Sequence, residues 1–149
     1  MESIENGSLQ NQIDIRSPKK KYYTSNAIFA MISPLIPVLE FAARNKIFHS
    51  DLKPANIYIT PDRKPKIADF GASVPLSTEY GNSPIQGTPE FFSYAIRSAW
   101  MESRSSGQSP DFKHDPEKSD VMSLAITVID LCLLKIVTGI NDLDTYEEV

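Results

Sequence analysis

Residues 49–56 read HSDLKPAN and residues 69–71 read DFG. Between them, apolar runs at 57–59 and 66–68 flank a polar turn with two prolines, which predicts a small β-hairpin. Polar side chains therefore come just before and just after one hairpin. An isolated aspartate usually caps a turn. An aspartate, a lysine and an asparagine at fixed steps, followed by a further aspartate, indicate a functional site instead.

The two stretches resemble the catalytic loop and the metal-binding turn of protein kinases, which follow the pattern H-R-D-L-x-x-x-N and then D-F-G. D-L-K-P is the form typical of serine/threonine kinases. The resemblance implies that Asp51 orients or accepts the proton of a substrate hydroxyl and that Lys53 lies beside the transferred phosphate. It also implies that Asn56 and Asp69 bind Mg²⁺ and, with Lys53, contact ATP. His49 would be structural, packing beneath the loop.

Two downstream segments extend the resemblance. Residues 87–91 read GTPEF, like the substrate-facing end of an activation segment. Thr88 would then hydrogen-bond near the aspartate and the lysine of the catalytic loop and belong to the catalytic set. Residues 115–124 read DPEKSDVMSL, like the entry to the central buried helix of the family. Asp120 would there brace the backbone of the catalytic loop.

The first residues resemble the hinge of a kinase and the short helix after it, which implies nucleotide contacts at Glu2 and Ile4. No two of the six glycines are separated by a single residue, so the 149 residues contain no glycine-rich phosphate loop of the G-x-G type. We therefore expect the small lobe to be absent, together with the later large-lobe helices. A complementary small lobe is an expected partner, along with a protein substrate or docking partner.

Two internal departures from the family pattern concern regulation. Ser50 stands where most kinases have an arginine that pairs with a phosphorylated activation loop. Activation by phosphorylation through this position is therefore not expected. Residues 93–95 read SYA in place of A-P-E, so the glutamate that normally ties the activation segment down is lost.

The periodicity predicts an α+β, mainly helical fold: a partial kinase-like C-terminal lobe with a small hairpin beside the catalytic loop. Ser8 is a candidate N-cap of a short helix, and Pro34 and Pro37 predict a kink or an irregular turn in the next one. Residues 91–102 are a further short helical candidate. The expected organisation of the single domain is a hinge-like segment and short helix (1–25), a long helix (26–48), the catalytic loop, hairpin and DFG (49–71), an activation segment (72–95), a loop (96–118), a central helix (119–139) and a tail (140–149).

The central helix is the main apolar element. Ser119 precedes its apolar run as a candidate N-cap and Gly139 follows as a stop, which predicts a helix over about 120–138. Apolar residues surround this helix on nearly every side, so we expect it to be buried at the centre of the lobe. The run 121–140 reaches membrane-spanning length, but it contains Asp130 and Lys135, which favours a buried soluble helix.

Composition narrows the function classes. The net charge is −4 and the basic residues are scattered apart from Lys19 to Lys21, which argues against nucleic-acid binding. Cys132 is the single cysteine, so an intrachain disulfide and a cysteine-rich metal cluster are excluded. The N-terminus lacks the basic start and apolar run of a secretory signal. We expect a cytoplasmic protein without membrane contact.

Three functions fit these observations. In the first, the chain belongs to an enzyme lineage that transfers phosphate from ATP to serine or threonine hydroxyls of proteins, and is inactive as an isolated chain. In the second, it is a pseudokinase-like binding or scaffold module without catalysis. In the third, it is a small-molecule phosphotransferase of related architecture, against which D-L-K-P and G-T-P-E argue.

Overall fold

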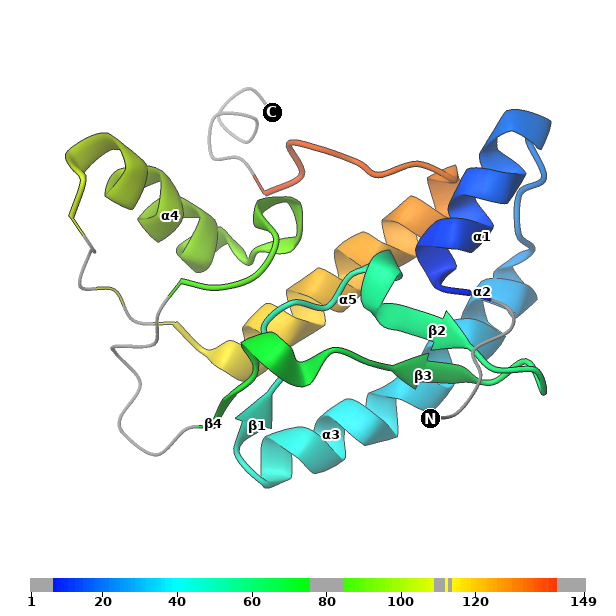
Figure 1. Ribbon diagram of the computed structural model, residues 1–149, viewed down its shortest axis with the longest axis horizontal. Helices are drawn as coiled ribbons and strands as arrows, with labels where there is room; N and C mark the ends of the chain where they lie inside the picture. The colour runs from blue at the N-terminus through cyan, green and yellow to red at the C-terminus, as the bar shows by residue number, and fades with distance from the viewer. Residues whose placement is uncertain (1–6, 76–84, 109–111, 113, 142–149) are drawn as a thin grey trace.

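The computed structural model describes residues 7–75, 85–108, 112 and 114–141, which form helices around the central helix α5 (Pro116–Leu133) with two small antiparallel strand pairs (Figure 1). The expected mainly helical α+β fold is confirmed. The α-helices are α1 (Leu9–Arg16), α2 (Ser25–Ile32), α3 (Ile36–Arg44), α4 (Tyr94–Ser106) and α5 (Pro116–Leu133). The strands are β1 (Ile47–Phe48), β2 (Ile57–Ile59), β3 (Pro65–Ile67) and β4 (Val74–Pro75). The expected hinge contacts, part of the activation segment and most of the tail lie outside the described residues.

The short helix α1 begins where its cap predicts. The Ser8 hydroxyl accepts a hydrogen bond from the Asn11 N–H (3.3 Å), and Asn11 Oδ1 accepts one from the Ser8 N–H (2.9 Å). This reciprocal cap satisfies two donors that a helix start otherwise leaves unpaired. The cap directs the apolar side of α1 into the main core cluster, whose buried members are Leu9, Ile13, Ile32, Leu35, Ile57 and Leu131.

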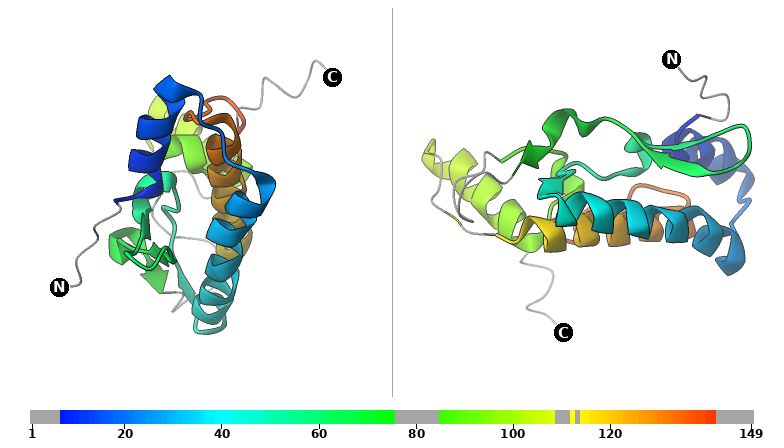
Figure 2. Two further views of the ribbon diagram at one scale, coloured as in Figure 1. Left: turned by 90° about the vertical axis from the view of Figure 1, so that its right-hand side faces the viewer. Right: turned by 90° about the horizontal axis from the view of Figure 1, so that it is seen from below.

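The expected long helix over 26–48 is divided into two. α2 starts after the N-cap Thr24, a 3₁₀ turn over Ser33–Leu35 follows it, and α3 then continues to Arg44. The prolines in this region lack the N–H that an uninterrupted helix needs, so the predicted irregular turn is confirmed. α2 and α3 together run alongside α5 (Figure 2).

The bounds expected for the central helix were wrong by several residues at both ends. α5 starts at Pro116, because the Asp115 carboxylate accepts hydrogen bonds from the N–H groups of Glu117 and Lys118. Proline suits the first helical position, where no N–H is required. The helix ends at Leu133, since Leu134 adopts a left-handed conformation (φ 51°), well before Gly139.

The expectation that α5 is buried on every side was also wrong, although the helix lies at the centre of the fold. Its buried face includes the polar residues Ser123, Thr127 and Asp130, while Val121 is 61% exposed and Leu133 is 47% exposed. Each buried hydroxyl donates to a carbonyl, with Ser123 bonding Phe91 O at 2.6 Å. Ser123 thus bonds to a segment that packs on the helix, whereas Thr127 bonds to a carbonyl of α5 itself, four residues back.

A loop was expected over residues 96–118, but the first part of this range is helical. α4 covers Tyr94–Ser106 and ends at Gly107, which takes a left-handed conformation (φ 68°) that glycine adopts without strain. The helix expected over 91–102 therefore exists but lies a few residues further along. The 3₁₀ turn η5 (Pro89–Phe91) comes before it.

Two strand pairings position the polar stretches. β2 pairs antiparallel with β3, with Ile57 opposite Ile67, which confirms the predicted hairpin. β1 pairs antiparallel with β4, with Phe48 opposite Val74. The connection from β1 to β2 holds residues 49–56, and the connection from β3 to β4 holds residues 68–73. Antiparallel pairing on both sides places these two connections next to each other.

One helical stretch in the described part of the chain, Ser25–Arg44, is long and apolar enough to cross a membrane by length and composition (mean hydropathy 1.6). It is the α2–α3 pair, and only 6% of its apolar window is buried. Length and composition do not separate a membrane span from a helix that packs against protein.

Candidate active site

The catalytic loop is fixed to the start of α5 by Asp120. Its carboxylate accepts hydrogen bonds from the His49 N–H (2.8 Å) and the Ser50 N–H (2.9 Å). Asp120 is buried, and burial raises the pKa of its carboxyl group, although the two N–H donors oppose that shift. Ser50 takes a left-handed conformation (φ 64°), which is strained for a serine. The predicted brace on the loop backbone is confirmed.

His49 packs beneath the loop, as expected for a structural residue. Its ring is buried, lies 4.8 Å from the Phe70 ring in an edge-on arrangement, and has Nε2 3.0 Å from the Ala68 carbonyl oxygen. The Asp51 N–H points at Nδ1 (3.3 Å). Nδ1 must therefore be the acceptor, so Nε2 carries the proton and donates to Ala68. Both ring nitrogens hold backbone in place.

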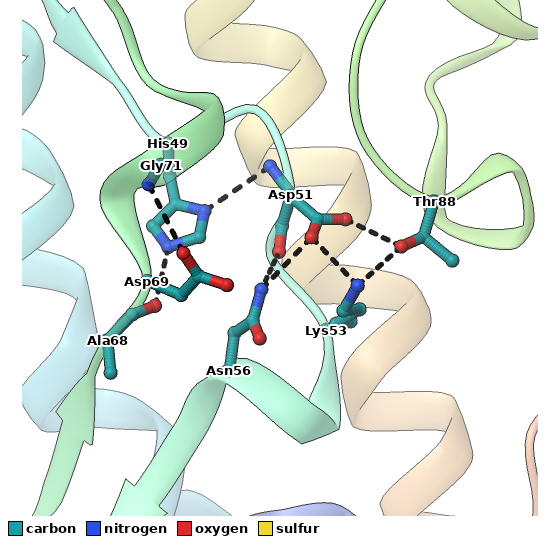
Figure 3. A network of polar contacts seen from close by, with 8 residues as sticks. All are labelled: His49, Asp51, Lys53, Asn56, Ala68, Asp69, Gly71 and Thr88. Carbon is teal, nitrogen blue, oxygen red and sulfur yellow. Dashed lines mark hydrogen bonds and ion pairs between the residues drawn. The ribbon is translucent and has the colours of Figure 1, made fainter.

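Asp51, Lys53 and Thr88 form a closed triangle of polar contacts (Figure 3). Thr88 donates to Asp51 Oδ1 (2.7 Å) and accepts from Lys53 Nζ (2.6 Å). Lys53 Nζ also lies 2.8 Å from Asp51 Oδ2. The contact of Thr88 with the aspartate and the lysine agrees with the expectation from sequence. Thr88 thus fixes the Lys53 ammonium group and the Asp51 carboxylate from 35 and 37 residues away in the sequence.

Asn56 orients its amide through the same aspartate. Its Nδ2 donates to the Asp51 main-chain carbonyl oxygen (2.9 Å) and to Asp51 Oδ2 (3.1 Å). The main-chain carbonyl of Asn56 accepts a hydrogen bond from the Ala68 N–H (2.9 Å). With both amide hydrogens directed at Asp51, the side-chain Oδ1 of Asn56 is the atom available to a cation. The bond to Ala68 holds the DFG turn beside the loop.

Asp69 begins the DFG turn in a left-handed conformation (φ 63°), and its Oδ1 accepts from the Gly71 N–H (3.3 Å). A side chain at Gly71 would crowd that same oxygen, with a Cβ 3.0 Å away. Figure 3 shows the carboxylate of Asp69 and the side chains of Asn56 and Asp51 projecting from their separate segments toward one region. Asp69 is exposed to solvent.

The donor set of this region suits a hard cation. Carboxylate and amide oxygens are the ligands that Mg²⁺ takes in proteins, usually one or two of them with waters and phosphate oxygens. Within the described ranges, no three His, Cys, Asp or Glu side chains come together to hold a metal. A metal at Asn56 and Asp69 would therefore take its remaining ligands from water or from phosphate oxygens.

Gly87 was expected at the site only as part of the GTPEF resemblance, and Asn141 was not expected there at all. Gly87 has φ 107°, and a Cβ at this position would collide with the Ser50 carbonyl oxygen. Its identity follows from close approach to the loop, which only the folded chain shows. Asn141, discussed below, contacts the segment around Pro89 from far along the sequence. Glu2 and Ile4, the expected nucleotide contacts, lie outside the described residues.

This combination of an aspartate held by lysine and threonine, an asparagine beside it, and an acidic turn after a hairpin is that of protein kinases. The sequence model of the protein kinase domain matches residues 1–148. The chain belongs to the protein kinase domain family.

Individual relatives are serine/threonine kinases. The chain is 32% identical over 133 residues to the serine/threonine-protein kinase PknL of Mycobacterium tuberculosis, which covers 88% of this chain and 29% of that protein. It is 30% identical over 141 residues to the serine/threonine-protein kinase nekl-2 of Caenorhabditis elegans, covering 91% of this chain and 36% of the relative. The chain thus spans about a third of the length of each.

Proposed function

We propose that this chain is the catalytic large lobe of a serine/threonine protein kinase, which transfers the γ-phosphoryl group of ATP to a protein hydroxyl. The observation that carries the proposal is the triangle of Asp51, Lys53 and Thr88. Phosphoryl transfer depends on positioning and charge neutralisation more than on covalent chemistry by the protein. A carboxylate and an ammonium group fixed at 2.8 Å supply both.

Asp51 is the residue that orients the acceptor hydroxyl. A carboxylate offers about four lone-pair sites. Among the described residues, Asn56 and Lys53 contact Oδ2 and Thr88 contacts Oδ1. The substrate hydroxyl would donate to the remaining site on Oδ1, which lies beside the threonine. Asp51 would then accept the hydroxyl proton as the hydroxyl oxygen bonds to the γ-phosphorus and the bond from that phosphorus to the bridging oxygen breaks, releasing ADP.

Lys53 and the metal ligands act on the phosphate. Lys53 Nζ keeps a third hydrogen beyond its contacts with Asp51 and Thr88, and this hydrogen would donate to an oxygen of the transferred group. Asn56 Oδ1 and Asp69 would hold Mg²⁺, which when bound neutralises charge on the triphosphate. Each role follows from the atom that the internal hydrogen bonds leave available.

Complementation with a small lobe tests the proposal. A small lobe from a related serine/threonine kinase would be fused before residue 1 or co-expressed, and transfer of labelled phosphate to a generic serine substrate measured. We expect transfer to appear, and Asp51→Asn to reduce kcat by at least about 10²-fold. The matched control is Asp62→Asn, at an exposed hairpin aspartate paired with Lys64. A folded, nucleotide-bound complex without transfer would contradict the proposal.

A second candidate, a scaffold that binds a protein partner without catalysis, has one observation in its favour. The α2–α3 pair exposes Phe29 (71%) and Phe41 (70%). A groove of about 350 Å³ between α3 and α5 is lined mostly by apolar side chains, among them Leu39 and Leu124. Apolar surfaces of this kind often mark contacts with other protein. The scaffold predicts that the complemented protein stays inactive while the Asp51 variant binds a partner as well as the unaltered chain.

A further inference from the structure

The chain turns back after α5 to reach the segment that carries Thr88. The left-handed residue Leu134 follows the last residue of α5, and Asp130 Oδ1 accepts a hydrogen bond from the Val137 N–H (2.8 Å). This bond closes the loop after the helix. Residues 134–141, drawn in orange to red in Figure 1, then run back from the end of α5 toward η5. The loop delivers Asn141 to a position remote from it in sequence.

Asn141 is buried and uses both amide hydrogens on main-chain carbonyls. Its Nδ2 donates to the Pro89 oxygen (2.9 Å) and to the Phe92 oxygen (2.8 Å), across 52 and 49 residues of sequence. Only 2% of the residue is exposed. A buried amide with two good acceptors is well satisfied, whereas a carboxylate of the same shape would face two carbonyl oxygens with no proton to donate.

α5 adds two hydroxyl contacts to the same segment. Ser123 Oγ donates to the Phe91 oxygen (2.6 Å), and the hydroxyls of Ser93 and Ser119 lie 2.8 Å apart. The carbonyls of three residues at or next to η5 thus each receive a side-chain donor. These contacts are neutral, in a segment where the sequence has SYA in place of the A-P-E that carries a charged tie in related kinases.

We propose that Asn141 is a positioning residue that holds Thr88 against Asp51 and Lys53. The inference deepens the proposed kinase function and rests on it for its consequence in activity. Thr88 directly precedes Pro89, whose carbonyl Asn141 holds, and the Thr88 carbonyl accepts the Phe91 N–H (2.9 Å) that closes η5. Fixing η5 therefore fixes the residue whose hydroxyl completes the triangle.

Hydrogen exchange tests the anchor without relying on activity. In Asn141→Asp, the amides of Phe91 and Phe92, which bond to the Thr88 and Pro89 carbonyls, should exchange roughly tenfold faster or more. The Ile59 amide, which bonds to the Gly7 carbonyl in the hairpin region, should keep its rate. The matched control is Asn45→Asp, at an exposed asparagine that donates to the Phe41 carbonyl (2.7 Å). This control should leave exchange at both places unchanged.

A milder variant guards against unfolding. Asn141→Ser shortens the side chain without introducing a charge, so it should disturb the fold less than Asn141→Asp and show the same selective acceleration by a smaller factor. Unchanged exchange at Phe91 and Phe92 in both variants would overturn the proposal. Equal acceleration at Ile59 would overturn it too, since it would mean a general loss of structure instead of a local anchor.

Activity of the protein complemented with a small lobe supplies the second readout. Asn141→Asp should lower kcat by about tenfold with a small change in the KM for ATP. In a Thr88→Val background, the same substitution should add no further loss, because its effect passes through Thr88. Additive losses would overturn the proposal. An inactive unaltered complex would instead count against the kinase function, and the exchange result would still decide whether Asn141 anchors η5.

Discussion

The carboxylate of Asp120 and the main-chain N–H of His49 are joined by a 2.8 Å hydrogen bond across 71 residues of sequence. The other carboxylate oxygen accepts from the next N–H along the chain, at Ser50. One buried side chain therefore holds two successive peptide groups, the second of them in a strained left-handed conformation. The catalytic loop keeps its shape because α5 supplies these acceptors.

Replacing Asp120 with asparagine should destabilise the protein. The amide retains one acceptor and turns an N–H₂ group toward a main-chain donor, so one charge-assisted bond is lost, worth roughly 1.5–3 kcal/mol. Urea denaturation measures the change in the free energy of unfolding. Asp14→Asn, at an exposed position where the carboxylate accepts from Gln10, is the control and should change it by less than about 0.5 kcal/mol. Equal effects of the two substitutions would refute the role of Asp120.

Gly87→Ala should displace Thr88 from the triangle. The added Cβ would collide with the Ser50 carbonyl oxygen and lie 3.1 Å from the Phe92 ring, so the segment has to move. We expect phosphoryl transfer by the complemented protein to fall about tenfold or more. Gly107→Ala is the control, because Gly107 shares a positive φ (68°) but has nothing within 4 Å of an added Cβ. Comparable losses in both variants would point to backbone strain in place of collision.

Asp130 should make stability depend on pH. Burial raises the pKa of this carboxyl to about 6, from an ordinary value of 3.8, although the bond from the Val137 N–H lowers it in part. Between these two values the folded state holds the proton that the unfolded chain has lost. The free energy of unfolding contributed by this group therefore falls as pH rises through the window and is constant above it.

The comparison with Asp130→Asn isolates this effect. Relative to the variant, the unaltered protein should gain about 1 kcal/mol of stability when the pH is lowered from 7.5 to 5. Urea denaturation at the two pH values gives the difference. A constant difference would show that Asp130 has the same pKa in the folded and unfolded states, and Asp14→Asn provides the exposed comparison.

Metal binding without nucleotide should be weak. Asn56 and the exposed Asp69 offer two oxygen ligands, and hydrated Mg²⁺ gives up water reluctantly for so few. We expect a dissociation constant no better than about millimolar, near −4 kcal/mol. Titration with Mn²⁺ as a paramagnetic probe should broaden the amide resonances around Asp69 and Asn56 first, and Asp69→Asn should abolish that preference. Broadening centred on other residues would show that the metal binds elsewhere and would contradict this assignment.

The 149 residues by themselves should transfer phosphate negligibly. They contain no glycine-rich phosphate loop, so a bound triphosphate would be free to move relative to Asp51. Orientation contributes ~7–11 kcal/mol to well-positioned reactions, and much of it would be forfeited. A transfer assay on the unaided chain measures this directly. Robust activity, sensitive to Asp51→Asn, would prove the expectation wrong.

Local chemistry made part of the structure predictable. The cap at Ser8, the irregular turn around Pro34 and Pro37, and the hairpin after Asn56 all depend on residues close in sequence, and all three are confirmed. The contact of Thr88 with Asp51 was also expected, although from family resemblance. No periodicity in the sequence predicts a hydrogen bond between those two side chains.

Residue types and their spacing were thus enough to predict which polar groups form the candidate site and which short elements flank it. The face that α5 buries and the contacts of Asn141 depend instead on how segments distant in sequence pack together. Burial of Ser123 and Thr127 is tolerable only because specific carbonyls lie opposite their hydroxyls. Apolar periodicity does not predict the partner of Ser123, since Phe91 belongs to a segment that the whole fold brings to the helix, whereas Thr127 donates to a carbonyl of α5 itself. Apolar composition also predicted burial of α5 on every side, yet Val121 and Leu133 are exposed. Which side of the helix is covered depends on where the other segments pack.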